Sequence, residues 1–414
     1  MARLFILNGR VVDPAGRINR RMDVVVQGGR VEALSRRARS KKSDRVLDAS
    51  GYLVLPGLID MHVHLRDPGM TAAEDVESGT RAAAAGGFAT VVCMPNTKPV
   101  LDNPKVLKAL LKKIKNKARI RVLAAPALSL GLRGKRLSDI EALFRAGAGA
   151  LSDDGIGTAD QKILGAALGR GMNCGLTILV HCEDHRLSGR AREDRATRAA
   201  LRALKQSGGR LHVQHVSTAG ALAAIRAAKK RGLPVSCEVT PHHIFLTAED
   251  VQGDPNMKMN PPLRNLRDRR ALLEGLADGT VDAIASDHAP HTREAKGRGF
   301  EKAPYGVTGL ETMLALTLRL VREKHVSLTR AVELLTRGPA RALGIAAGTL
   351  EPGAPADITV VDPDRRWRVI PSKMKSRSSN TAFAGWEMQG KTQWTIVGGR
   401  VVYSARRRAK WSRS

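Results

Sequence analysis

Residues 59–69 read IDMHVHLRDPG and place two histidines one residue apart at the end of an apolar run. In a β-strand, residues i and i+2 point to the same face, so His62 and His64 can both reach one ion. An open doubly wound sheet would normally carry a Gly-rich phosphate loop after its first strand instead. The stretch therefore predicts a metal-binding strand end and favours a barrel over an open sheet.

The apolar run that leads into His62 is the first of eight short apolar runs along the chain. Segments rich in Ala, Leu, Lys and Arg lie between most of them, and this alternation of strand and helix implies parallel pairing. Eight such units predict an α/β protein built on a closed (β/α)8, or TIM, barrel. The expected strands are 53–61, 88–94, 120–125, 148–152, 176–181, 211–216, 234–239 and 281–286. The expected helices include 74–87, 103–118, 138–147, 159–171 and 218–232.

The two ends of the chain carry a different pattern, typical of antiparallel strands. Residues 4–13 (LFILNGRVVD) and 23–34 (DVVVQGGRVEAL) predict hairpins with Gly turns, and 394–403 (WTIVGGRVVY) repeats the design. Residues 356–361 predict one more strand. We therefore expect both termini to form one small β-sandwich beside the barrel. The predicted parts are 1–56 and 345–404 for the two portions of the sandwich, 57–344 for the barrel and 405–414 for a basic disordered tail.

Composition narrows the classes of function. The chain has 414 residues and a net charge of +30, but its basic residues are scattered, which indicates a solvated basic surface. A nucleic-acid-binding role is motivated by this charge alone, and aromatic residues, at 3%, are too few to stack on single strands, so we expect no specific nucleic acid. Four cysteines without C-x-x-C spacing indicate neither a zinc ribbon nor a disulfide framework. Without a signal-peptide pattern or a membrane-spanning run, we expect a cytoplasmic protein with no membrane partner.

Ionisable or amide side chains follow seven of the eight expected strands, where barrel active sites lie. Imidazole and carboxylate are ligands that zinc prefers, and four histidines with two aspartates are too many for one tetrahedral ion. We therefore predict two ions bridged by a carboxylate and a hydroxide, a site suited to hydrolysing an amide or imide or to the reverse condensation. An aspartate after the last strand can move the proton to a leaving nitrogen. In chain order these side chains are His62, His64 and Arg66; Asn96; Asp153 and Asp154; His181 and Glu183; His215; Glu238; and Asp287, His288 and His291.

Taken together, these segments resemble the dihydroorotase family, the cyclic amidohydrolases of pyrimidine synthesis. The most specific are HLRDPG (64–69), MPNT (94–97) and SDHAPH (286–291), and the resemblance extends over nearly the whole chain. It looks like the bacterial type I enzymes, whose metal bridge is an aspartate rather than a carboxylated lysine. The resemblance implies a TIM barrel of the amidohydrolase type and the reversible cyclisation of N-carbamoyl-L-aspartate to L-dihydroorotate plus water, in de novo UMP biosynthesis.

The resemblance implies a centre of two divalent ions, with Zn²⁺ the expected metal. The bridging hydroxide would attack the ring carbonyl next to the ring nitrogen, and Asp287 would act as general acid/base. Asp154 is assigned as the bridge in preference to Asp153, because the second Asp, directly before Gly155, matches the family position. The implied ligands are His62, His64 and Asp287 for one ion, His181 and His215 for the other, and Asp154 for both.

The resemblance also implies a site for an anionic substrate. A carboxylate beside the metals needs a cation, and arginine binds carboxylate through two parallel hydrogen bonds. A homodimer is usual for the family, and association with aspartate transcarbamoylase is a further expectation. The implied substrate-binding residues are Arg66, Asn96 and His291 for the carboxylate, and Asn260, Tyr305 and Gly306 for the ring amides.

Two alternative interpretations stay open. Dihydropyrimidinases, hydantoinases and allantoinases share the chemistry, but their substrates are neutral or carry their charge elsewhere, which the context of Arg66 disfavours. A catalytically weak partner of aspartate transcarbamoylase would be expected to have lost ligands, whereas all six are present. The passage 185–210 is shorter than is usual for the family.

Overall fold

Eight parallel strands form a ring in the larger part of the molecule. The structure is a computed structural model that describes residues 3–157 and 160–405. The strands form two hydrogen-bonded groups, and parallel bridges between Val63 and His288 and between Ala127 and Ser152 close the ring at both seams. The predicted barrel is therefore confirmed. The predicted tail lies outside the described residues from 406 onward. The strands are β8 (Leu58–Val63), β9 (Phe88–Cys93), β10 (Arg121–Ala124), β11 (Leu151–Ser152), β12 (Thr177–Val180), β13 (Arg210–Val213), β14 (Val235–Val239) and β15 (Ala283–Ile284).

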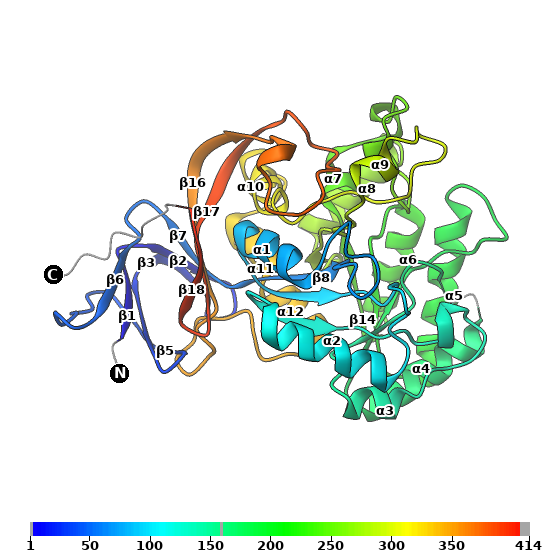
Figure 1. The fold of residues 1–414 in the computed structure, drawn as a ribbon, viewed down its shortest axis with the longest axis horizontal. Helices are drawn as coiled ribbons and strands as arrows, with labels where there is room; N and C mark the ends of the chain where they lie inside the picture. Colours follow the sequence, from blue (N-terminus) through cyan, green and yellow to red (C-terminus); the bar gives the residue numbers. More distant parts are fainter. Residues whose placement is uncertain (1–2, 158–159, 406–414) are drawn as a thin grey trace.

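Helices follow the barrel strands and cover the outside of the ring (Figure 1). Local sequence sets where they begin. The side chain of Asp75 accepts a hydrogen bond from the backbone N–H of Ser78 at the start of α1, and Asn103 does the same for Val106 in α2. None of the described helices is long and apolar enough to cross a membrane. The longer helices are α1 (Val76–Gly86), α2 (Pro104–Lys117), α3 (Ile140–Arg145), α4 (Gln161–Asn173), α5 (Ala191–Ser207), α6 (Ala219–Lys230), α8 (Leu266–Ala277), α10 (Met313–Arg322), α11 (Leu328–Leu335) and α12 (Arg337–Leu343). The shorter ones are α7 (Pro241–Phe245), α9 (Arg293–Lys296), η1 (Leu130–Leu132), η2 (Ala248–Asp250), η3 (Pro255–Met257) and η4 (Pro371–Lys373).

Both ends of the chain form a β-sandwich, at the left of Figure 1. Strand β7 pairs antiparallel with β16, with Pro56 opposite Ile358, so C-terminal strands complete a sheet that N-terminal strands begin. The prediction of one sandwich built from both termini is therefore confirmed. One sheet has the order β5 (Arg30–Ser35), β4 (Asp23–Gln27), β1 (Leu4–Leu7) and β6 (Arg45–Asp48). The other has the order β18 (Arg400–Ser404), β17 (Glu387–Val397), β16 (Ile358–Arg368), β7 (Leu53–Pro56), β2 (Arg10–Asp13) and β3 (Ile18–Arg21).

Two details of the strand prediction are wrong. Residues 4–13 do not form a hairpin, because β1 and β2 belong to different sheets and the chain crosses between them at Asn8, whose φ is 67°. The expected strand 53–61 is two strands, β7 in the sandwich and β8 in the barrel. The chain divides at Gly57, where a Cβ atom would lie 2.5 Å from Cβ of Ala89. Neighbouring backbones can approach there only because the residue is glycine.

The barrel and the sandwich share a hydrophobic core. The largest cluster of buried side chains runs from barrel residues such as Val91 to Leu55 and Val361 of the sandwich. A separate cluster fills the space between the two sandwich sheets. The two parts are thus packed against each other through apolar contacts, which fixes the barrel strands and their carboxyl ends.

Candidate metal-binding active site

The six side chains predicted to bind metal gather at the carboxyl ends of the barrel strands, and all six are buried. Backbone φ is positive at His215 (33°) and Asp287 (45°), and also at Arg66 (56°). Residues other than glycine seldom adopt this conformation, and it concentrates at functional sites. His62 lies on β8 with His64 just beyond it, and Asp154, His181, His215 and Asp287 follow β11, β12, β13 and β15.

One group of possible ligands consists of His62, His64 and Asp287. Oδ1 of Asp287 lies 3.2 Å from Nε2 of His64 and 3.5 Å from Nε2 of His62. One ligand atom from each of the three residues lies within 4.8 Å of the others. Two imidazoles and a carboxylate thus converge on a space of the size that one ion needs.

A second group surrounds Asp154. Its Oδ1 atom lies 3.7 Å from Nε2 of His215 and 3.8 Å from Nδ1 of His181, and those two nitrogens are 2.8 Å apart. The same oxygen is 3.3 Å from Nε2 of His62, and His62, Asp154 and His215 form another set within 4.8 Å. Asp154 therefore lies between the two groups, where a ligand shared by two ions would have to be.

The orientation of His62 suits it to bind a cation. Nδ1 lies 2.8 Å from Oε1 of Glu238. An ionised carboxylate only accepts hydrogen bonds, so Nδ1 carries a proton, and Nε2 is the nitrogen that a cation can bind in exchange for a proton. Nε2 is buried and has no hydrogen-bond partner among the described residues. A buried ring nitrogen that faces two carboxylates is satisfied by a divalent cation, so the residues fit a metal centre.

Polar groups behind the ligands fix the orientation of the rings. Glu238 also lies 3.2 Å from Nε2 of His212. Oε2 of Glu183 lies 2.9 Å from Nε2 of His181 and accepts a hydrogen bond of 2.9 Å from Nδ2 of Asn260. Nδ1 of His181 is thereby left to face Asp154. Such partners hold metal-binding histidines in one tautomer.

Burial and the imidazoles act in opposite directions on the carboxyl groups. Burial raises the pKa values of Asp154 and Asp287, but neighbouring histidines, His62 foremost, hold both below the ordinary range. Burial also opposes ionisation of Glu238, yet hydrogen bonds from His212 and His62 lower its pKa to about 2. All three groups are therefore ionised at neutral pH, as cation binding requires.

A cavity of about 270 Å³ adjoins the ligand cluster. Asn96 connects the two, because its Oδ1 atom lies 2.9 Å from Nδ1 of His64 and its Nδ2 donates to Asp154 at 3.2 Å. The cavity is therefore continuous with the ligand atoms. All six residues predicted to bind substrate line it: Arg66, Asn96, Asn260, His291, Tyr305 and Gly306.

Arg66 is a buried cation in this cavity without a carboxylate within 4.0 Å in the described part of the chain. Its Nε donates to the carbonyl oxygen of Pro290 at 3.1 Å, and Nη2 lies 3.2 Å from Nε2 of His291. Burial lowers the pKa of Arg66 to about 10, so the side chain stays charged. Burial and the charge of Arg66 lower the pKa of His291 to about 3. A guanidinium held in this way is ready to pair with a carboxylate.

The backbone carbonyls of Tyr305 and Gly306, and the N–H of Gly306, already have partners. The carbonyl oxygen of Tyr305 accepts from His291 at 2.7 Å, and Tyr305 is exposed. Gly306 donates its N–H to the carbonyl oxygen of Lys258 at 2.9 Å, and its own carbonyl accepts from Asn380 at 3.1 Å. Each of these two carbonyls keeps a second acceptor position for a ring amide.

Sequence reasoning misses several supporting residues. It assigns no role to Glu183 and Glu238, although both lie at strand ends, and it gives none to Asn380, which accepts from the backbone N–H of His291 at 3.0 Å. Both glutamates follow or end predicted strands, as the predicted ligands do, and this position could have identified them as part of the site. Asp153 accepts from the backbone N–H of His181 at 2.8 Å, while Asp154 faces the histidines.

Comparison with known proteins gives a consistent picture at the level of sequence. The sequence model of the amidohydrolase family matches residues 53–402 of this chain. The chain is 44% identical to the dihydroorotase of Geobacter metallireducens, over 97% of this chain and 99% of that protein. It is equally 44% identical to the dihydroorotase of Syntrophotalea carbinolica, with 97% and 99% covered.

Solved structures share the architecture at lower identity. The L-hydantoinase (dihydropyrimidinase) of Arthrobacter aurescens superimposes with a TM-score of 0.90 at 28% identity, over 98% of this chain and 96% of that one. The D-hydantoinase of a Bacillus species, strain AR9, gives a TM-score of 0.85 at 25% identity, with 97% and 95% covered. The arrangement of barrel and sandwich is thus common to hydantoinases, while sequence identity is higher with the dihydroorotases.

Proposed function

The chain belongs to the amidohydrolase family, among its dihydroorotases, and from this premise we propose how its site cyclises N-carbamoyl-L-aspartate to L-dihydroorotate reversibly. It is a metal-dependent cyclic amidohydrolase that acts on a small molecule. The observation that carries the proposal is the buried guanidinium of Arg66, which has no carboxylate within 4.0 Å in residues 3–157 and 160–405, in a cavity that adjoins the cluster of four histidines and two aspartates. The cluster supports amide chemistry, and the arginine supports a substrate with a carboxylate next to the reacting bond.

We assign His62, His64 and Asp287 to one divalent ion, His181 and His215 to a second, and Asp154 to both, with Zn²⁺ the preferred metal. When bound, the ions lower the pKa of water and polarise the carbonyl that is attacked. Because Glu238 meets Nδ1 of His62 and Glu183 meets Nε2 of His181, Nε2 of His62 and Nδ1 of His181 are the nitrogens that would hold the ions. The donor set of imidazole and carboxylate is the one that zinc prefers.

Asp287 is the proposed general acid/base. Its carboxylate is ionised, lines the cavity and lies at the edge of the ligand cluster. It accepts a proton from the attacking water and returns it to the departing ring nitrogen; in the direction of cyclisation it carries the proton the other way.

Substrate selection falls to the wall of the cavity. Arg66, Asn96 and His291 bind the substrate carboxylate, and Asn260, Tyr305 and Gly306 contact the ring amides. Hydantoinases have closely similar folds, so the fold alone does not separate the two activities. A neutral substrate ring would supply no negative charge to balance the buried guanidinium of Arg66, which favours an anionic substrate.

The test is a comparison of turnover. Purified protein is assayed with L-dihydroorotate, 5,6-dihydrouracil, hydantoin and allantoin under one set of metal conditions. We expect kcat/KM for dihydroorotate to exceed the others by roughly 100-fold or more, since a site built around a charge rejects substrates that lack it. Equal or better turnover of dihydrouracil would reassign the chain to the dihydropyrimidinase activity.

We also propose features of the protein outside the site. The division into residues 1–56 and 345–404 for the sandwich and 57–344 for the barrel follows the point where the chain passes from β7 to β8. A homodimer and an association with aspartate transcarbamoylase are proposals that light scattering of the protein, alone and mixed with that enzyme, would test. A cytoplasmic location is in keeping with four free cysteines.

A further inference from the structure

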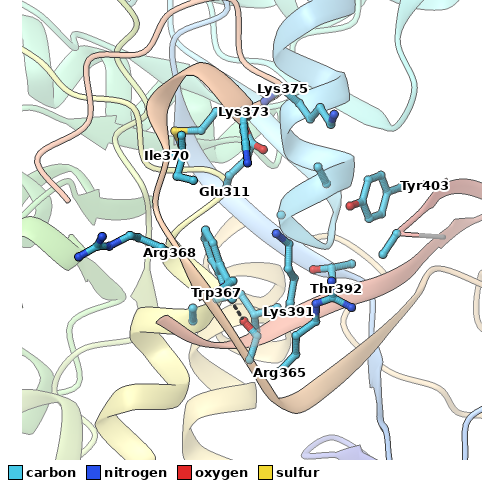
Figure 2. Close-up of a pocket in the computed structure, with 17 residues that line it drawn as sticks. Glu311, Arg365, Trp367, Arg368, Ile370, Lys373, Lys375, Lys391, Thr392 and Tyr403 are labelled. Atoms are coloured by element: carbon cyan, nitrogen blue, oxygen red, sulfur yellow. Dashed lines mark hydrogen bonds between the residues drawn. The ribbon is translucent and has the colours of Figure 1, made fainter. Parts of the chain in front are cut away.

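A second cavity lies where the barrel meets the sandwich, between helices α1 and α10 and strands β16, β17 and β18 (Figure 2). Its volume is about 240 Å³, and it shares no lining residue with the active-site cavity. It is therefore a separate site, formed where the C-terminal strands of the sandwich pack against barrel helices α1 and α10.

Basic side chains dominate its wall. Arg368 turns away in Figure 2 and pairs with Glu387 at 3.2 Å. Among the described residues, none of the other four cations has a carboxylate within 4.0 Å. Those four are Arg365, Lys373, Lys375 and Lys391.

Lys391 is fixed in the wall of the cavity rather than extended into solvent. It is half-buried on β17, and its Nζ lies 4.4 Å from the centre of the Trp367 ring. Nε1 of Trp367 donates to the carbonyl oxygen of Gly390 at 3.0 Å, which holds the ring in place. Burial, and next the charge of Arg365, lower the pKa of Lys391. A partly buried ammonium beside another cation is stabilised by a bound counter-ion.

Glu311, the one carboxyl group among the lining residues, is already engaged. Its Oε1 atom accepts from the backbone N–H of Lys375 at 2.6 Å and from that of Ser376 at 3.1 Å. Burial raises its pKa to about 7, so near neutral pH it carries only part of a negative charge. The charge of the cavity is therefore clearly positive.

We propose that this cavity binds a small polyvalent oxyanion of the phosphate class, about the size of pyrophosphate. At about 30 Å³ for each water, the cavity has the volume of roughly eight water molecules, which is enough for two linked phosphoryl groups. Cations from separate segments, Arg365 on β16 and Lys391 on β17, surround the space, and Tyr403 and Thr392 add hydroxyl groups. Such a set suits an anion with several charged oxygens better than one carboxylate.

The test is calorimetric titration of the metal-loaded full chain with inorganic pyrophosphate at a fixed salt concentration of about 0.15 M, close to physiological ionic strength. Three proteins are compared: the wild type, the double variant R365Q/K391Q, and the double variant K41Q/K42Q, which removes the same charge from exposed lysines of the sandwich. Any binding of pyrophosphate to the catalytic metals is the same in all three. R365Q alone, at an exposed position, guards against misfolding of the double variant.

We expect R365Q/K391Q to weaken one binding event by at least roughly tenfold and R365Q to weaken it less, with K41Q/K42Q unchanged within about twofold. An equal loss in the two double variants would overturn the proposal in favour of the general charge of the protein, as would identical titrations of the wild type and R365Q/K391Q. Adenosine 5′-diphosphate in place of pyrophosphate distinguishes the source of the phosphoryl groups. Tighter binding indicates a nucleotide, and equal binding indicates the free oxyanion.

Discussion

His62 points its two ring nitrogens at different partners: Nδ1 lies 2.8 Å from Glu238, and Nε2 faces Asp154 at 3.3 Å. The carboxylate of Glu238 thereby decides which nitrogen keeps a lone pair for the metal. Glu238 also lies 3.2 Å from His212, so it is held from a second side. The relationship makes Glu238 a positioning residue for metal binding, although it touches neither the ions nor the substrate.

Replacing Glu238 with Gln should weaken metal binding. The amide can still meet Nδ1 but no longer requires it to carry the proton, and the lost charge lowers the basicity of Nε2. We expect the affinity for Zn²⁺ to fall by roughly 10- to 100-fold, measured by competition with a fluorescent chelator. Glu249→Gln, at an exposed position, is the control. Unchanged metal affinity in Glu238→Gln would remove the positioning role.

Replacing Asp287 with Asn should separate metal binding from turnover. The amide oxygen can remain in the ligand cluster, but it cannot accept a proton at neutral pH. We expect kcat for dihydroorotate hydrolysis to fall by roughly 1,000-fold or more while metal content stays close to that of the wild type. Activity near the wild-type level would rule out Asp287 as the general acid/base.

Replacing Arg66 with Met should change substrate preference. The variant keeps the bulk of the side chain but loses the charge that faces the cavity. We expect KM for dihydroorotate to rise by roughly 10- to 100-fold, as befits the loss of a charge-assisted pair, with little effect on neutral 5,6-dihydrouracil. A parallel loss for both substrates would show that Arg66 supports the fold of the site rather than selecting the carboxylate.

Glu311 should make stability depend on pH. Burial raises its pKa from an ordinary 4.5 to about 7, against the opposing influence of Lys375 and Lys391. Between these values the folded protein holds a proton that the unfolded chain has released. This stabilising contribution is therefore fully present below about pH 4.5 and is lost as the pH rises through about 7.

Glu311→Gln keeps the hydrogen-bond acceptor and removes the titration. Relative to wild type, the variant should gain up to roughly 3 kcal/mol in free energy of unfolding between pH 5 and pH 8, the equivalent of the pKa shift. Urea denaturation at a series of pH values measures the difference. A difference between the two proteins that does not vary with pH would contradict the assignment.

The barrel could be predicted from sequence because its periodic pattern is local. Runs such as 88–94 and 176–181 are apolar on both faces, as buried parallel strands require, and each lies between amphipathic helices. The error at residues 4–13 has a tertiary cause. An Asn-Gly pair predicts a tight turn, but only packing against β7 decides that the chain passes to the other sheet.

The candidate ligands could be named because histidine and aspartate at strand ends carry a chemical signal of their own. Supporting residues such as Asn380 and Glu183 could not, since their roles depend on which distant segment they meet. Asn380 lies 89 positions from His291 along the chain, yet its side chain holds the backbone of that residue. Nothing in the local sequence indicates such a contact.

The central claim is that these imidazoles and carboxylates bind two ions jointly, and metal content measures it most directly. Elemental analysis by mass spectrometry is carried out on wild type, on His181→Ala and on His325→Ala, a histidine outside the cluster whose side chain is 37% exposed. We predict two equivalents of divalent metal in wild type and in His325→Ala, and about one in His181→Ala. Wild-type protein that stays active with one equivalent or none, or His181→Ala that retains both ions, would contradict the account.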